Sequence, residues 1–242
     1  MTGEAFHQAG CLICGSEISY SREDSERICA ICGTTVSTNV ACTAGHYVCD
    51  TCHCHSANDL IQRICVTSRS TSPLELASQL MHSPLVKMHG PEHHFLVPAV
   101  LLSAWSNLLG VPEEDKKRKI ETARRRAEDV KGGACGFLGS CGAAVGTGIF
   151  VSLITNATPL SRSEWAMANL MTSESLKVIA EHGGPRCCKR DTFLAILAAA
   201  SFLRTRMNLD LDVSAGARCT WTDRNRECLK KECPFFTGRV GS

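Results

Sequence analysis

The chain has 242 residues with 26 basic and 24 acidic side chains, a formal net charge of +2, and 44% hydrophobic residues. This composition is typical of a globular protein and excludes a disordered or collagen-like chain. The near balance of charge gives no indication of binding to nucleic acid or to an anionic membrane. The exceptional feature is the content of 16 cysteines.

The cysteines gather in three clusters, within residues 11–54, 135–188 and 219–233, with Cys65 alone between the first two. Residues 1–7 lack the basic and apolar regions of a secretory signal, so we expect a cytoplasmic protein. Cytoplasmic thiols stay reduced, and clustered reduced cysteines indicate metal or redox chemistry rather than disulfides.

The first cluster predicts a module that binds two zinc ions. It contains two Cys-x2-Cys pairs, each followed by glycine, then a Cys-x3-His pair and a third Cys-x2-Cys pair. A tight Cys-x2-Cys turn brings both thiolates to one tetrahedral ion. The eight candidate ligands are Cys11, Cys14, Cys29, Cys32, Cys42, His46, Cys49 and Cys52.

The pairing of these ligands stays open at this stage. The two ions could be bound in sequence order or in a cross-brace, and His53, Cys54 and His55 are alternative ligands. The second half of the set resembles RING-like and treble-clef modules. Residues 1–57 show too little apolar periodicity for a core of their own, which a structural metal remedies.

After residue 57 the pattern is helical. Ser72, Pro73 and Glu75 predict a helix start that continues to about residue 88. Further helices are expected over 93–109, 113–131, 132–154, 161–182 and 186–207, the last apolar nearly all round and therefore central. The uncharged stretch 132–161 has a continuous apolar part over 143–154 only, too short to cross a bilayer that needs ~20 apolar residues.

We therefore predict a mainly α protein: a helical bundle with a small N-terminal zinc-binding module and a Cys-rich C-terminal tail. The expected organisation is a zinc module over residues 1–57, a linker over 58–72, a helical core over 73–210 and the tail over 211–242.

The second cluster predicts a site inside the bundle. Cys135 and Cys141 lie among glycines, whose backbone can wrap closely around an inorganic group, although the same pattern also suits close helix packing. Cys187 and Cys188 begin a buried helix, where the dipole lowers the pKa of a thiol. We expect Cys135, Cys141 and Cys187 to share one inorganic group, and Cys188 to be a candidate reactive thiol.

The third cluster, in the tail, comprises Cys219, Cys228 and Cys233, the last followed by proline as at ferredoxin-type sites. Three thiolates leave one position on a four-iron cluster, open to substrate, water or a cysteine from the core. The tail either folds back onto the central site or binds its own ion, and zinc is the alternative metal there.

Two family resemblances extend this interpretation. The chain resembles an uncharacterised bacterial and archaeal family with a zinc-ribbon start; the shared stretches are Gly45-His46-Tyr47-Val48-Cys49-Asp50, His93-His94-Phe95-Leu96-Val97-Pro98-Ala99, Cys135-Gly136-Phe137-Leu138-Gly139-Ser140-Cys141-Gly142 and Gly183-Gly184-Pro185-Arg186-Cys187-Cys188. Residues 132–200 also resemble, more distantly, the catalytic domain of iron–sulfur L-serine dehydratases. The matching motif is Cys187-Cys188-Lys189-Arg190-Asp191, with Asp where that family has Asn, and the resemblance implies a four-iron cluster with an open iron acting as Lewis acid. In such a lyase we expect Arg190 to anchor a carboxylate and His94 to be the general base. His93 is the alternative base, and both histidines could instead cap or pack against the core.

Two functions are expected. The first is a metal-binding protein with zinc and an iron–sulfur cluster that acts as a lyase or sulfur-handling enzyme on a small-molecule substrate. The alternative is a non-enzymatic metal- or redox-sensing adaptor that docks a partner protein through its zinc module. An enzyme should show a pocket where glycine backbone, Cys187 and a histidine meet, whereas an adaptor should show the metal ligands closed, with no open position. Oligomeric state is not indicated.

Overall fold

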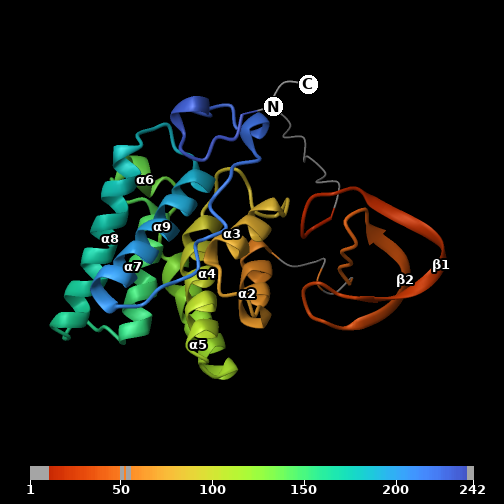
Figure 1. Ribbon diagram of the computed structural model, residues 1–242, viewed down its shortest axis with the longest axis horizontal. Helices are drawn as coiled ribbons and strands as arrows, with labels where there is room; N and C mark the ends of the chain where they lie inside the picture. Colours follow the sequence, from red (N-terminus) through yellow and green to blue (C-terminus); the bar gives the residue numbers. More distant parts are fainter. Residues whose placement is uncertain (1–10, 50–51, 53–55, 239–242) are drawn as a thin grey trace.

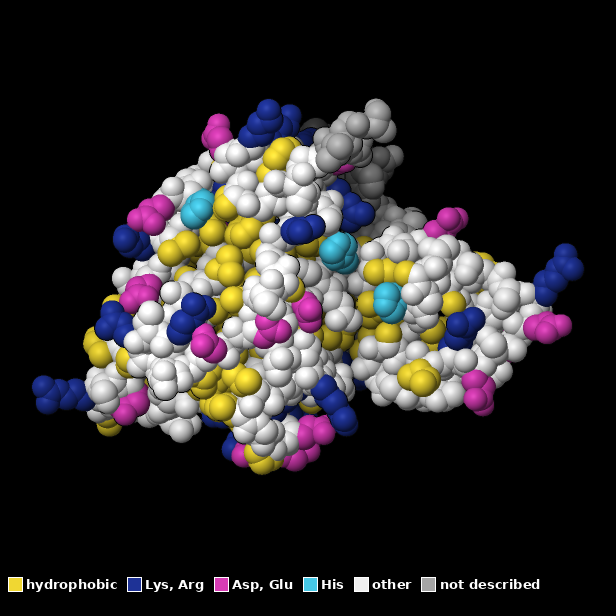
Figure 2. All heavy atoms as spheres, viewed as in Figure 1, with side chains coloured by type: hydrophobic (Ala, Val, Ile, Leu, Met, Phe, Trp, Pro, Cys, Tyr) yellow, Lys and Arg dark blue, Asp and Glu magenta, His cyan; other side chains and the backbone are white. Residues whose placement is uncertain are grey.

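The computed structural model describes residues 11–49, 52 and 56–238. A two-stranded sheet near the N-terminus lies to one side of a helical bundle, and the tail runs across one end of that bundle (Figure 1). With all atoms drawn, the part that contains the sheet stands beside the bundle, and acidic and basic side chains are interspersed over the face in view (Figure 2). The prediction of a mainly α protein with a small N-terminal module is confirmed.

The N-terminal sheet is an antiparallel hairpin. Strand β1 (Ile18–Ile28) pairs with β2 (Thr35–Cys42), with Ile18 opposite Cys42 and Ile28 opposite Thr35. The register shifts between Tyr20 and Ser25, and most of β1 is exposed. A two-stranded hairpin is marginally stable in water, so this module depends on other support.

The helices follow in chain order. Their bounds are α2 (Ala57–Thr67), α3 (Pro73–His82), α4 (Glu92–Leu108), α5 (Glu113–Glu128), α6 (Ala134–Phe137), α7 (Gly142–Thr155), α8 (Ser163–Glu181) and α9 (Cys188–Met207), with short 3₁₀ turns η1 (Thr222–Arg224) and η2 (Lys230–Glu232). Helix α3 begins at the predicted cap, where the Ser72 hydroxyl accepts from the Glu75 amide. It ends at His82 rather than near residue 88, because Ser83 precedes Pro84 and the residue before proline disfavours helical backbone.

Helix α2 begins at Ala57 and covers most of the segment 58–72, where the sequence predicted a short helix start and a linker. Ser56 and Asp59 form a capping box at its start, and its apolar face, including Leu60 and Ile61, is fully buried. That face packs against α4, where the Ser103 hydroxyl donates to the Cys65 carbonyl at 2.6 Å. The helical core therefore includes α2.

Close packing explains the glycines of α7. A Cβ on Gly146 would lie 2.8 Å from Pro98 Cδ and 3.0 Å from the His94 carbonyl, so glycine lets α7 approach α4. Gly148 meets Thr172 of α8 in the same way. Among the described residues, no helix is both long and apolar enough to span a membrane.

Helix α9 is buried along most of its length, and the tail covers its first turns. Trp221 and Phe235 of the tail are buried, with ring centroids 6.2 Å and 5.3 Å from that of Phe193 on α9. The Cys219 amide donates to the Phe235 carbonyl at 2.8 Å, which closes the tail into a loop. This packing brings the tail cysteines to the start of α9.

Candidate metal centres

The N-terminal module contains two groups of metal-ligating side chains, each with its four ligand atoms within 4.8 Å of one another. The first group is Cys11, Cys14, Cys42 and His46, and the second is Cys29, Cys32, Cys49 and Cys52. The first ligand pair along the chain thus joins the third, and the second joins the fourth. This interleaving is the cross-brace that the sequence left open; His53, Cys54 and His55 lie outside the described residues.

The spacing within each group suits a tetrahedral ion. Sγ atoms are 3.8 Å apart for Cys14 and Cys42, and 3.7 Å apart for Cys32 and Cys49. His46 Nδ1 lies 3.3 Å from the Cys14 sulfur. Thiolates at zinc–sulfur distances of ~2.3 Å around a tetrahedral ion lie ~3.8 Å apart. Both groups could therefore hold a metal ion such as zinc.

Both Cys-x2-Cys turns have the same backbone geometry. Gly15 and Gly33 each have φ +74°, and their amides donate to the carbonyls of Cys11 and Cys29 at 2.8 Å and 2.9 Å. A positive φ suits glycine, which explains the residue that follows each pair. The hairpin strands lead from one turn to the next and so fix the two groups relative to each other.

The thiols of these groups are electrostatically uneven. Hydrogen bonds from the Thr34 hydroxyl and backbone lower the pKa of Cys32 to about 6. Burial acts to raise the pKa of Cys14, but hydrogen bonds from Ser16 and His46 outweigh it and lower the pKa to about 6. Burial raises the pKa of Cys11 to about 11. Burial likewise raises the pKa of Cys52 in the second group. Each group thus contains one thiol of lowered pKa beside one of raised pKa, and a bound cation favours the thiolate form.

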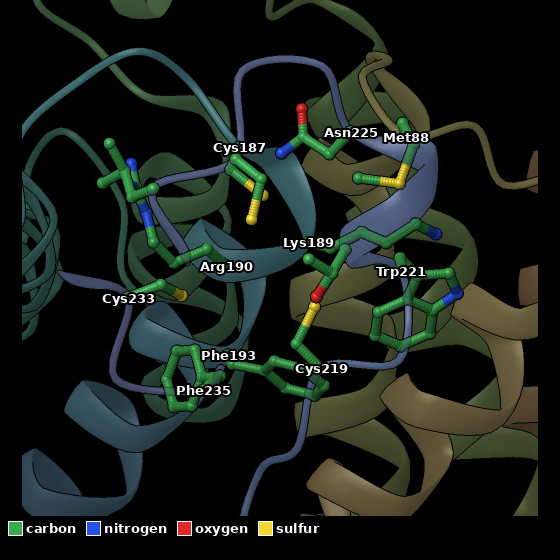
Figure 3. Close-up of a pocket in the computed structure, with 13 residues that line it drawn as sticks. Met88, Cys187, Lys189, Arg190, Phe193, Cys219, Trp221, Asn225, Cys233 and Phe235 are labelled. Atoms are coloured by element: carbon green, nitrogen blue, oxygen red, sulfur yellow. The ribbon is translucent and has the colours of Figure 1, made fainter. Parts of the chain in front are cut away.

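A second sulfur-rich region lies where the tail crosses the start of α9. Four cysteines line one cavity: Cys187, Cys219, Cys228 and Cys233. Apolar side chains, among them Met88, Trp221 and Phe235, form much of the remaining wall. Figure 3 shows the sulfur atoms of Cys187, Cys219 and Cys233 directed toward a common space.

Backbone amides donate to the sulfurs around this cavity. The Lys230 amide lies 3.3 Å from Cys228 Sγ. Burial raises the pKa of Cys187 and that of Cys233, and hydrogen bonds from the backbone of Arg190 and Phe235 partly offset this effect. The pKa of Cys187 at the start of α9 is therefore raised, and the prediction that the helix start lowers it is wrong. Such hydrogen bonds stabilise thiolates and, at an iron–sulfur cluster, help to set its reduction potential. Two buried cations, Lys189 and Arg190, also line the cavity. The surroundings therefore fit an anionic sulfur centre.

These four cysteines differ from the N-terminal groups in their spacing. Among the described residues, only the two N-terminal groups bring three or more ligand atoms within 4.8 Å. The cavity thiols are therefore spread more widely than a single tetrahedral ion requires. A four-iron cluster binds each thiolate through a different iron and so holds the thiolates farther apart.

The glycine-rich cysteines lie elsewhere. Cys135 and Cys141 line a separate hollow, together with Arg190 and Asp191. Burial raises the pKa of Cys141 to about 11 and that of Cys188 to about 12, and the charge of Cys141 acts on Cys188. The structure thus brings Cys187 together with the tail cysteines and leaves Cys135, Cys141 and Cys188 outside that cavity.

The candidate base does not face either space. His94 Nδ1 lies 3.0 Å from the Val130 carbonyl, and its ring packs against Gly142. His93 is fully buried, between the Thr192 hydroxyl at 2.9 Å and the Lys87 carbonyl at 3.0 Å. Neither histidine lines the sulfur cavity or the hollow. Both interact as packing side chains of α4.

Arg190 stands between the two spaces. It lines both the sulfur cavity and the hollow, and it is only 4% exposed. Its Nε lies 3.1 Å from an Asp191 carboxylate oxygen, and its Nη2 donates to the Gly183 carbonyl at 2.7 Å.

The sequence contained a signal for the joint site of α9 and the tail. Trp221 and Phe235 are large apolar residues in a tail that is mostly polar, and such residues are usually buried against another part of the protein.

A protein-family model matches most of this chain. Residues 61–236 match the model of a family described as a family of unknown function (DUF5714). No curated protein and no solved structure matches. The comparisons therefore lend no support to the resemblance to iron–sulfur L-serine dehydratases.

Proposed function

Since the chain belongs to this family of unknown function, DUF5714, we propose its function from its own residues: a metal-binding redox protein. Its helical domain holds a four-iron cluster on Cys187, Cys219, Cys228 and Cys233, beside a module that two zinc ions stabilise. The observation that carries the proposal is the convergence of four cysteines from α9 and the tail on one apolar cavity.

The donor sets support the division between the two metals. One N-terminal group combines three cysteines with an imidazole and the other has four cysteines, and both have single-ion spacing, which suits zinc. The sulfur cavity offers four cysteines as ligands. Their sulfur atoms are more widely spaced than the ligand atoms of the N-terminal groups, and apolar side chains surround them. Burial among apolar groups and amide–sulfur hydrogen bonds are the features by which proteins tune iron–sulfur clusters.

Four cysteines occupy every corner of a four-iron cluster. A cluster bound in this way exchanges electrons and offers no open iron to a substrate hydroxyl. This arrangement favours the redox-sensing or electron-transferring adaptor over the lyase, which needs an open iron and a base beside it. His94 does not line the cavity. The zinc module then supplies the surface for docking a partner protein.

The adjacent cysteines at the start of α9 provide a matched test. Anaerobically purified protein is expected to contain about four iron and four sulfide per chain, with about two zinc ions. Cys187→Ala should lose iron and the cluster absorbance, because it removes a corner ligand. Cys188→Ala removes the neighbouring thiol, outside the cavity, and should retain both.

Two results would overturn the proposal. One is wild-type protein that contains zinc but no iron after anaerobic purification. The other is equal loss of iron in both variants, which would mean that the start of α9 matters only for folding. Circular dichroism on each variant separates ligand loss from unfolding.

A further inference from the structure

Beside the sulfur cavity lies the hollow of about 540 Å³ between the ends of α6, α8 and α9. Its walls include Cys135, Cys141, Gly183, Gly184, Arg186 and Arg190. The volume lies within the range of small-molecule sites. The metal-binding function uses none of this space except the shared side chain of Arg190.

The charge of the hollow is positive. Arg186 is exposed, and no acidic partner for it is found among the described residues. Lys177 lines the rim, paired with Glu181 at 3.5 Å. Asp191 is the acidic side chain of the lining, and the Arg190 guanidinium pairs with it at 3.1 Å. Since Lys177 and Arg190 are each paired with a carboxylate, the charge of Arg186 remains unbalanced and makes the hollow attractive to an anionic ligand.

A buried donor in the wall lacks a partner. The Nη1 atom of Arg190 is buried and makes no hydrogen bond, although Nε and Nη2 of the same guanidinium are both satisfied. Nη2 is bound to the carbonyl of Gly183, which itself lines the hollow, so the guanidinium reaches this wall. An unpaired buried cationic N–H costs free energy, and an anion is the partner that relieves it.

The backbone around the hollow permits close approach. Gly183 has φ +67° and Gly139 has φ +64°, and a Cβ on either would meet nothing within 4 Å. Helix α7, of 14 residues, begins directly after Cys141, and α9, of 20 residues, begins two residues after Arg186. The N-terminal ends of helices attract negative charge, and this attraction adds to the positive charge of the two arginines.

We propose that this hollow binds a small molecule through an oxyanion, a carboxylate or a phosphate, held by Arg186 and the free Nη1 of Arg190. The thiols of Cys135 and Cys141 then lie beside the rest of the ligand. The site goes beyond the metal-binding function and does not depend on it, because none of the four cysteines of the sulfur cavity lines the hollow.

The test is titration calorimetry on the full chain at low ionic strength, with inorganic phosphate in one arm and malonate in the other. One site per chain is expected for at least one probe, and the stronger arm identifies the oxyanion. Arg186→Gln should weaken that binding about tenfold or more, because it removes a charged hydrogen-bond donor. Arg162→Gln, an exposed arginine at the start of α8, should bind as the wild type does.

Alkylation gives an independent readout. The bound anion should slow the reaction of iodoacetamide with Cys135, which is partly exposed in the hollow. The proposal fails if neither anion binds at millimolar concentration, or if Arg162→Gln weakens binding as much as Arg186→Gln. Iron and zinc contents measured on the same samples keep this outcome separate from the fate of the metal sites.

Discussion

Acidification should destabilise the helical bundle through His93. This side chain is fully buried at the start of α4, where its Nε2 donates to the Lys87 carbonyl and its Nδ1 accepts from the Thr192 hydroxyl. Burial and the neighbouring charge of Lys189 lower the pKa of His93 to about 3 from its ordinary value of 6.5. The native state therefore keeps this histidine neutral where the unfolded chain takes up a proton.

The sign and size of the effect follow from that difference. Above pH 6.5 both states are neutral and His93 costs nothing. As the pH falls below 6.5, the unfolded state binds the additional proton, and the free energy of unfolding decreases by about 1.4 kcal/mol per pH unit. Between pH 7 and pH 5 the loss should reach about 2 kcal/mol, a large part of the stability of an ordinary domain.

Urea unfolding at pH 7, 6 and 5 measures this loss, with His93→Gln compared against wild type at each pH. The variant is expected to be less stable at pH 7, because glutamine cannot satisfy both partners, yet to lose less stability on acidification. Thr192→Val is the control, since it removes one hydrogen bond and keeps the buried histidine. Parallel pH dependences in wild type and His93→Gln would refute the reasoning.

Three further changes test other parts of the structure. Gly146→Ala should lower the free energy of unfolding by about 1–3 kcal/mol in thermal or urea melts, because its Cβ would press on Pro98 and the backbone of α4; Gly136→Ala, which meets nothing within 4 Å, should be close to neutral. A zinc chelator should release about two ions and make the β1–β2 hairpin sensitive to protease while the helical circular dichroism persists, and simultaneous loss of the helical signal would contradict this. Trp221→Ala should lower the free energy of unfolding by about 3–5 kcal/mol and reduce the iron content, because this buried ring packs the tail against α9. Full iron content in the variant would show that the tail cysteines keep their positions without the Trp221 side chain.

The sequence was most informative where chemistry is local. Cys-x2-Cys turns with a following glycine depend on a few consecutive residues, so all eight zinc-ligand candidates could be identified, and they lie in the two groups. Helix starts were equally local, as at Ser72 and Glu75. The cross-brace could not be deduced, because it depends on how the hairpin returns the chain from the first turn to the third.

The sulfur cavity depends on packing between distant segments. The packing of Trp221 and Phe235 against Phe193 determines which cysteine of the core lies beside the tail cysteines. The spacing of cysteines along the sequence does not predict that contact. The glycines near Cys141 had suggested a loop around a cofactor. Close helix packing, the alternative explanation, holds at Gly142, which makes room for His94 of α4, whereas Gly132, Gly136 and Gly139 meet no atom within 4 Å.

The start of α9 separates two chemical environments with one pair of adjacent cysteines, because successive residues at a helix start face different neighbours. Cys187 faces the tail, and Arg190, one turn later, lines both the sulfur cavity and the hollow.

The positive charge of Arg190 favours the reduced cluster, which is the more negative of its two states. An anion bound at Arg190 offsets this charge. Saturating phosphate or malonate should therefore lower the midpoint potential of the cluster, measured by redox titration. By linkage the oxidised protein should bind the same anion more tightly than the reduced protein. An anion that binds with equal affinity to both redox states would show that Arg190 does not couple the two sites, even where each site exists.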